Sequence, residues 1–332
     1  MPLTLGITGG AGFVGTNLAA AAVERGHRVV LVDVGDRLQR VAHAGPDRSG
    51  ECHFVDLAQP GARMPDDLDL IIHLAALPHV DYSLRYPEQV MANNLAVHTT
   101  VLGTARERGI PVLFTSSIEV YGGNEGPRFS EDDRLRPLSP YAASKVGCEY
   151  LADSYRAAYS CAITTLRLTN LYGPWQAPDR VIPRLIGQAF IGQESEAVLG
   201  RLRDFLYIDD AIGAILAVVE AGCWGGTYNL CAGEGVTLDH IAGLITSICG
   251  RGQFRSLEFP DFDGRGVSLV ASPRRLVEAI DWKPATALAE GIERTVSWYR
   301  DHRSWWSPFE PALRADRQGP DFLLDHVYRI GN

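Results

Sequence analysis

The sequence lacks three features that mark whole classes of protein: paired cysteines, an excess of basic residues and a long apolar run. Its six cysteines form no Cys-x-x-Cys pair, and its nine histidines show no metal-ligand spacing, so we expect no metal site and a reducing compartment. Lys and Arg number 31 against 40 Asp and Glu, a net charge of −9 that disfavours a nucleic-acid partner. No stretch suits a signal peptide or a membrane span, so we expect a cytoplasmic protein without a membrane partner.

Glycines follow the first strand-like run at a spacing that suits a phosphate site. Residues 8–15 read Thr-Gly-Gly-Ala-Gly-Phe-Val-Gly, between an apolar run and an Ala-rich amphipathic run. Gly9 permits a tight turn, Gly12 lets a pyrophosphate approach the backbone, and Gly15 lets the next helix pack on the strand. The second strand ends in Asp33, whose carboxylate can bind both ribose hydroxyls and repel a 2′-phosphate. The pattern therefore predicts a site for NAD rather than NADP.

Strand-like and helix-like segments alternate along the first half of the 332 residues. We expect strands at 3–7, 28–33, 53–55, 68–74, 111–115 and 162–168, and helices at 16–25, 87–109 and 140–158. This alternation predicts an α/β fold with a Rossmann-type, doubly wound parallel sheet. After Tyr172-Gly173-Pro174 the elements become shorter and richer in Gly and Pro, which indicates a smaller second lobe. We expect an NAD-binding domain over 1–173, rejoined by about 204–230, a substrate-binding lobe mainly over 174–300, and an extension over 301–332.

A second group of candidate catalytic residues lies where the later strands end. Tyr141 and Lys145 are four residues apart on an expected helix, so both lie on one face. A nearby ammonium group stabilises a phenolate, as does a positive nicotinamide ring, so Tyr141 can act as a base near neutral pH. Ser117, in a Ser-Ser turn after the strand 111–115, can share the proton with Tyr141; a plain turn is the alternative.

Several motifs together make the chain resemble a known family. They are TGGAGFVG (8–15), HLAA (73–76), SSIEVYG (116–122), SPYAASK (139–145), RLTNLYGP (167–174), RDFLYIDD (203–210) and DWKPATALAEGI (281–292). With these motifs, residues 3–300 resemble the extended short-chain dehydrogenase/reductases, in the NAD-dependent sugar-nucleotide epimerase/dehydratase group. The resemblance implies a nucleoside-diphosphate sugar as substrate, with hydride moving from the sugar C4 to NAD and later back to the sugar.

The resemblance also implies roles for individual residues. The catalytic residues would be Ser117, Tyr141, Lys145 and Glu119. The cofactor would contact Gly9, Gly12, Phe13, Val14, Gly15, Asp33, Asp56, Leu57, Leu74, Ala75 and Ala76, together with Tyr141 and Lys145. The substrate would contact Ser117 and Asn170, and its diphosphate would bind Arg203 and Arg265, because a guanidinium suits phosphate. A solvated surface cation is the alternative for each arginine, more so for Arg265, whose neighbourhood departs from the usual Arg-x-Gly-Asp pattern.

The fate of the 4-keto sugar separates the activities within this family. Its dehydratases carry Asp-Glu where this chain has Ile118-Glu119, and isoleucine cannot protonate a departing C6 hydroxyl. Its decarboxylases use an arginine whose position falls near Leu269, and its uronate epimerases often carry an arginine where Ala177 stands. These departures favour an NAD-dependent NDP-sugar 4-epimerase, an isomerase, acting on a neutral hexose or N-acetylhexosamine.

Glu119 keeps other interpretations open. A glutamate before Val-Tyr-Gly is typical of the lyases, in which it acts on C5, so a dehydratase with Glu119 as the C5 base is the leading alternative. A purely structural role for Glu119 is as plausible on sequence alone. A non-catalytic NAD-binding regulatory protein is a third interpretation, and the intact Ser117, Tyr141 and Lys145 argue against it.

The last thirty residues lie outside the resemblance. They contain Trp305-Trp306-Ser307-Pro308-Phe309 and Phe322-Leu323-Leu324, which are too aromatic and apolar to suit a freely solvated segment. Packing on the substrate lobe, packing across a dimer interface and a solvated tail all remain open. The resemblance implies a homodimer that forms through the helices at about 88–108 and 141–158.

Overall fold

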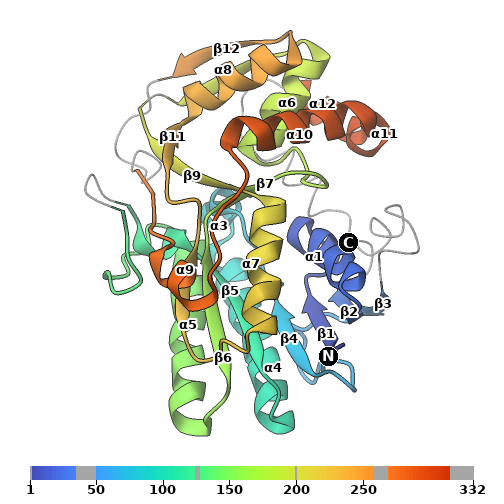
Figure 1. Cartoon of the computed structure of the whole chain (residues 1–332), viewed down its shortest axis with the longest axis vertical. Helices are drawn as coiled ribbons and strands as arrows, with labels where there is room; N and C mark the ends of the chain where they lie inside the picture. The colour runs from blue at the N-terminus through green and yellow to red at the C-terminus, as the bar shows by residue number, and fades with distance from the viewer. Residues whose placement is uncertain (1, 35–49, 124–127, 199, 258–267, 315–332) are drawn as a thin grey trace.

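The computed structural model describes residues 2–34, 50–123, 128–198, 200–257 and 268–314. Figure 1 shows two parts: a large sheet flanked by helices below, and a smaller lobe of helices and short strands above. No helix in these ranges is both long enough and apolar enough to cross a membrane.

Seven of the described strands form one parallel sheet. In spatial order they are β10 (Thr227–Leu230), β6 (Ile163–Leu168), β5 (Val112–Ser117), β4 (Leu70–His73), β1 (Thr4–Thr8), β2 (Arg28–Asp33) and β3 (Glu51–Phe54). The central strands are apolar on both faces, as expected for a sheet covered by helices on both sides: Leu5, Ile7, Ile71 and Ile72 are fully buried. This confirms the predicted doubly wound α/β fold.

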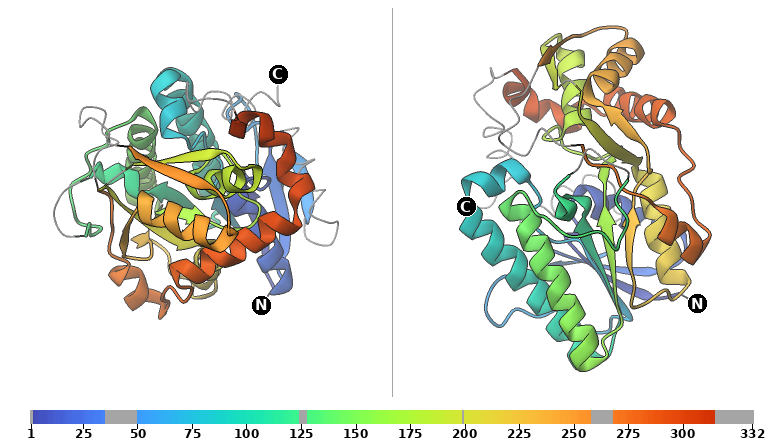
Figure 2. Two further views of the ribbon diagram at one scale, coloured as in Figure 1. Left: turned by 90° about the horizontal axis from the view of Figure 1, so that it is seen from above. Right: turned by 90° about the vertical axis from the view of Figure 1, so that its left-hand side faces the viewer.

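Helices cover both faces of the sheet. α1 (Phe13–Glu24) and α7 (Ile208–Glu220) contact each other on one face. α3 (Val80–Arg85), α4 (Pro87–Arg108) and α5 (Pro140–Tyr159) pack together on the other, as Figure 2 shows. α4 ends at Gly109, which has the left-handed φ of 68° that favours glycine, and α5 begins where the Ser139 hydroxyl accepts a hydrogen bond from the Ala142 amide.

The upper lobe is built on three helices, α6 (Val181–Ile191), α8 (Leu238–Cys249) and α10 (Leu288–Asp301). A three-stranded sheet of β7 (Asn170–Tyr172), β9 (Leu202–Tyr207) and β11 (Gly235–Thr237) lies between this lobe and the main sheet. β8 (Glu194–Val198) pairs with β12 (Gln253–Leu257), and α9 (Arg274–Ile280) contacts β10.

The described part of the C-terminal extension packs on the lobe. α11 (Arg303–Trp306), the 3-10 turn η4 (Ser307–Phe309) and α12 (Glu310–Arg314) follow α10, and α12 contacts α6. Trp306 is 1% exposed within the main hydrophobic core. Of the three possibilities for the extension, packing on the lobe therefore holds for residues 303–314, while Phe322-Leu323-Leu324 lies outside the described residues.

The predicted elements agree with the structure to within a few residues, with one correction. Ser116 and Ser117 were expected to form a turn, but they are the last two residues of β5 and pair with Arg167 and Leu168 of β6. Hydrogen bonding to β6 continues the ladder past the apolar residues, so these polar side chains are buried, 3% and 8% exposed.

Candidate active site

A cleft of about 640 Å³ lies at the carboxyl ends of the sheet strands, between the sheet and the lobe. This is where open parallel sheets bind their ligands. Every residue predicted for the cofactor lines it: Gly9, Gly12, Phe13, Val14, Gly15, Asp33, Asp56, Leu57, Leu74, Ala75, Ala76, Tyr141 and Lys145. Ser117, Glu119 and Asn170 line it as well.

The Gly-rich turn between β1 and α1 has the geometry predicted for a phosphate cradle. Gly9 has φ of 69°, and a Cβ there would lie 2.9 Å from the Ala75 backbone nitrogen. A Cβ on Gly15 would lie 2.5 Å from the Gly9 carbonyl oxygen. α1 begins at Gly12 without a side-chain cap, so its first amides remain available to an anion. The turn therefore fits the pyrophosphate of a dinucleotide.

Asp33 lies beside this turn, at the end of β2. Its Oδ2 accepts from the Ala11 amide at 3.0 Å, and its Oδ1 accepts from the Val34 amide at 2.8 Å. These two amides fix the carboxylate at the rim of the cleft, where an adenosine ribose would meet it.

Ser117, Tyr141 and Lys145 converge at the far end of the cleft. Tyr141 lies in the first turn of α5 and hydrogen-bonds Ser117 at the end of β5. Lys145, one turn later, donates from Nζ to the Thr115 carbonyl at 2.9 Å. All three side chains are buried, so water does not compete with these contacts.

Burial governs the ionisation of this group. It raises the pKa of Tyr141 to about 12, while the guanidinium of Arg180 and the hydrogen bond from Ser117 act in the opposite direction. Burial also lowers the pKa of Lys145 to about 8. Desolvation of the phenolate thus outweighs the nearby charges of the protein. The positive ring of oxidised nicotinamide would add the charge that this site needs.

Glu119 is presented to the cleft by the 3-10 turn η2 (Ile118–Tyr121). The Glu119 amide donates to the Ser117 hydroxyl at 3.2 Å, which ties the glutamate to Ser117. Burial raises the pKa of the Glu119 carboxyl, and the charges of Arg203 and Arg180 act against that rise. A partly buried carboxyl with a raised pKa suits proton transfer.

The Ile118 side chain has no acidic proton, and it lies among apolar residues. It is 1% exposed and packs in an apolar cluster with Tyr121, Phe129 and Leu269. Leu269 lies near the position expected for the arginine of the decarboxylases. Ile118 and Leu269, the two positions that depart from the family's pattern, therefore lie in one apolar cluster. Within η2, Glu119 is the residue that brings a carboxyl to the cleft.

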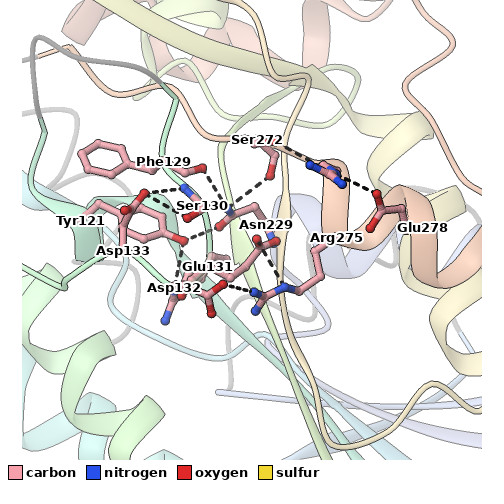
Figure 3. Close-up of polar contacts among 12 residues, drawn as sticks. Tyr121, Phe129, Ser130, Glu131, Asp132, Asp133, Asn229, Ser272, Arg275 and Glu278 are labelled. Carbon is pink, nitrogen blue, oxygen red and sulfur yellow. Dashed lines mark hydrogen bonds and ion pairs between the residues drawn. The ribbon is translucent and has the colours of Figure 1, made fainter.

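A polar network behind η2 fixes this turn, as Figure 3 shows. The Tyr121 hydroxyl donates to Asn229 Oδ1 at 2.7 Å. The backbone N–H of Asn229 donates to Glu131 Oε1, also at 2.7 Å. Arg275 forms an ion pair with Asp132 and lies 3.7 Å from Glu131. The network joins η2 to β10 and α9, so the position of Glu119 is set by contacts far from it in sequence.

Arg167 anchors the same network through a buried ion pair. It donates from Nε and Nη2 to Glu149, with Nη2 to Oε2 at 2.7 Å, and from Nη1 to the Tyr121 hydroxyl at 2.7 Å. Both side chains of the pair are 7% exposed. Removing one partner leaves an uncompensated buried charge, so we predict that Glu149→Ala lowers the free energy of unfolding by about 3–5 kcal/mol.

Denaturant unfolding of the purified variants checks this prediction. The exposed pair Arg274–Glu278, with side chains 82% and 62% exposed, supplies the control: Glu278→Ala should cost less than about 1 kcal/mol. Equal losses in the two variants would contradict the role assigned to the buried pair.

The structure also places residues in the cleft that the sequence did not single out. His79 Nε2 and Asp179 Oδ2 are 3.0 Å apart, and both residues line the cleft together with Arg180 and Arg184. Burial and Arg180 lower the pKa of His79; burial would raise the pKa of Asp179, but its contacts with His79 hold it below its usual value. The pair is therefore a neutral imidazole beside a carboxylate. His79 and Asp179 come from distant segments with no motif spacing, so only the fold reveals them.

The residues predicted to bind substrate differ in where the structure places them. Asn170 lines the cleft and donates from Nδ2 to the Asp204 carbonyl at 3.0 Å. Arg203 is close enough to lower the pKa of Glu119, but among the described residues it is not one that lines the cleft, and its Nη1 donates to the Leu202 carbonyl. Arg265 lies outside the described residues. Its role and the diphosphate contact of Arg203 stay predictions.

A family model described as the NAD dependent epimerase/dehydratase family matches residues 5–231. The chain belongs to this family. A curated relative, dTDP-glucose 4,6-dehydratase of Mycobacterium tuberculosis, is 30% identical over 94% of this chain and 98% of its own length. A dTDP-glucose 4,6-dehydratase from Streptomyces venezuelae, solved with NAD, superposes with a TM-score of 0.83 at 26% identity, over 92% of this chain and 99% of that one. A UDP-glucose 4-epimerase from Thermus thermophilus, also solved with NAD, superposes with a TM-score of 0.78 at 26% identity, over 90% and 100%.

Membership confirms the predicted family, its NAD dependence and its sugar-nucleotide chemistry. The protein is thus an enzyme of the NAD-dependent sugar-nucleotide epimerase/dehydratase type, and NAD is its cofactor. The Gly-rich turn, Asp33 and the buried Ser117, Tyr141 and Lys145 fit that cofactor, as the geometry above shows.

We expect Asp33 to determine whether the protein binds NAD or NADP more tightly. A hydrogen bond to a charged group is worth about 1.5–3 kcal/mol, so we predict that Asp33→Ala weakens NAD binding about 10–100-fold. The same variant should gain affinity for NADP, because the repulsion of its 2′-phosphate is removed. Calorimetric titration with NAD and with NADP measures the ratio of the two affinities. Equal affinities in the unmodified enzyme would refute this role for Asp33.

Proposed function

We propose that this protein is an NAD-dependent dehydratase, a lyase that removes water from a nucleoside-diphosphate hexose through a transient 4-keto sugar. The observation that carries the proposal is the Glu119 carboxyl, which lines the cleft directly beside Ser117 and has a raised pKa. The dTDP-glucose 4,6-dehydratases among its relatives, similar over nearly the whole chain, support the same reaction type. This choice reverses the order of preference that Ile118 suggested from sequence alone.

In the first half of the reaction, the protein side chains that act are Ser117, Tyr141 and Lys145. Bound NAD supplies the hydride acceptor, and later the hydride donor. Tyr141, as phenolate, takes the proton of the sugar C4 hydroxyl while Ser117 hydrogen-bonds the same oxygen. Lys145, held by the Thr115 carbonyl, adds positive charge and is placed to hold the nicotinamide ribose. The sugar is then a 4-ketone.

Glu119 carries out the elimination. The ketone acidifies the neighbouring C5–H, so the Glu119 carboxylate takes that proton and the electron pair of the C–H bond forms a C5=C6 double bond. The C6–O bond breaks, and the hydroxyl leaves as water with the proton that Glu119 now carries. One carboxyl serves as base and then as acid, because Ile118 cannot be the acid. The hydride would then return from the cofactor to C6, and C5 would take up a proton in place of the one that Tyr141 removed from the C4 hydroxyl, so that the net loss is one water.

A 4-epimerase is the second candidate, and Ile118 is the observation in its favour. Epimerisation returns hydride to the opposite face of C4 and needs only Ser117, Tyr141 and Lys145. The similarity to the UDP-glucose 4-epimerase fold is compatible with this reaction. In that case Glu119 would have no proton to move.

Mass spectrometry of the products distinguishes the two candidates. The purified enzyme is incubated with UDP-, dTDP-, GDP- and CDP-hexoses, and the sugar nucleotides are analysed before and after. We expect one of them to lose the mass of one water. A new sugar nucleotide of unchanged mass, with no dehydrated product, would replace the dehydratase proposal by the epimerase.

A further inference from the structure

Trp305 lines the cofactor cleft although it lies beyond the segment that the family model matches. It is carried by α11, directly after α10, and is partly exposed. Its ring packs edge-on against Trp175 at 5.9 Å and against Trp298 at 5.2 Å between ring centroids. His302 stacks on Trp298 at 4.4 Å and completes the cluster.

Trp175 places this cluster next to the Gly-rich turn. The carbonyl before it, that of Pro174, accepts from Asn17 Nδ2 at 3.1 Å, and the same amide group donates to the Phe13 carbonyl at 2.8 Å. Phe13 and Asn17 form the first turn of α1, so Trp175 lies beside the end of the helix that faces the pyrophosphate. Trp175 has φ of 68°, a left-handed conformation that a tryptophan rarely adopts, so the surrounding contacts must hold it.

Buried contacts fix the other side of the cluster. The Tyr299 hydroxyl donates to the Gln176 carbonyl, and Trp306 Nε1 donates to the Tyr299 carbonyl at 2.7 Å. Tyr299 is fully buried and Trp306 is 1% exposed. Figure 1 shows α11 at the end of the lobe, above α1. Trp305 is therefore held in a set position in the wall of the cleft.

We propose that Trp305 is a cofactor-retaining residue: its indole forms the outer wall of the cleft and slows the release of NAD. An enzyme that returns NAD to its starting state in each cycle gains from keeping it bound, since release of NADH in mid-cycle would strand the keto sugar. The inference rests on the NAD site of the family and holds for either reaction above.

The exchange rate of bound cofactor tests the proposal. Holoenzyme is mixed with excess isotopically labelled NAD, and the bound nucleotide is followed by mass spectrometry after denaturation. We expect Trp305→Ala to release NAD at least about tenfold faster, and Trp305→Phe to stay within about threefold of the unmodified enzyme, because an aromatic wall remains. Trp282→Ala is the matched control: Trp282 is partly buried against the same core but does not line the cleft, and its exchange rate should not change.

Folded Trp305→Ala that exchanges NAD at the unmodified rate would overturn the proposal. So would equal acceleration in Trp282→Ala, which would indicate a general loosening of the lobe. If Trp305→Ala does not fold, energy transfer from tryptophan to bound NADH decides instead. Trp305→Phe should then lose more of the sensitised NADH emission than Trp282→Phe, and an equal loss would refute the placement of Trp305 beside the cofactor.

Discussion

Replacing Tyr141 with phenylalanine is expected to reduce turnover by about 10²–10⁴-fold, the usual contribution of a positioned general base. In the proposed reaction the Tyr141 phenolate takes the proton of the sugar C4 hydroxyl, and phenylalanine has no oxygen to take it. The ring volume is unchanged, so the fold and NAD binding should survive. Steady-state kinetics with the active sugar nucleotide measure turnover, a thermal melt measures the stability of the fold, and a titration measures NAD binding.

A second tyrosine on the same helix supplies the control. Tyr150 lies on α5 but is 61% exposed, and Tyr150→Phe should leave turnover unchanged. If Tyr141→Phe turned over at nearly the normal rate, the active centre described above would be misplaced.

Glu119→Gln is expected to stop dehydration while allowing the first oxidation. The amide cannot take the C5 proton, so the dehydrated product should fall by at least about 10²-fold. Because Tyr141 and Lys145 remain, the sugar is still oxidised, and enzyme-bound NADH should accumulate after substrate is added. Absorbance of the bound nucleotide, followed in a rapid-mixing experiment, detects this; Tyr141→Phe should show no such accumulation.

The exposed Glu278 provides the matched substitution, since Glu278→Gln should have no effect on either readout. Glu119→Gln with normal turnover would mean that Glu119 is structural, and the epimerase would then be the better interpretation.

The fold and a set of candidate cofactor residues could be predicted from the sequence because both rest on local rules. A left-handed glycine such as Gly9, an acid at a strand end such as Asp33 and a four-residue helical spacing such as that of Tyr141 and Lys145 are all readable within short segments. The cofactor residues accordingly lie together in one cleft.

Contacts between distant segments could not be predicted, because no local pattern in the sequence marks them. The contact of His79 with Asp179 joins the start of α3 to the lobe, and neither residue has a local pattern that marks it. Ile118 and Leu269 were noticed separately, but only the fold shows that they share one apolar cluster. The pKa of Tyr141 depends on its burial, which no spacing in the sequence reports.

The fate of a C5 deuterium tests the proposed reaction most directly. A sugar nucleotide that the enzyme converts is prepared with deuterium at C5 of the hexose, and the product is analysed by NMR and mass spectrometry. If Glu119 removes the C5 hydrogen, the deuterium passes to the carboxyl, leaves with the departing water and is lost from C5 of the product. A product that retains the full label at C5 would contradict elimination and show that only C4 reacts.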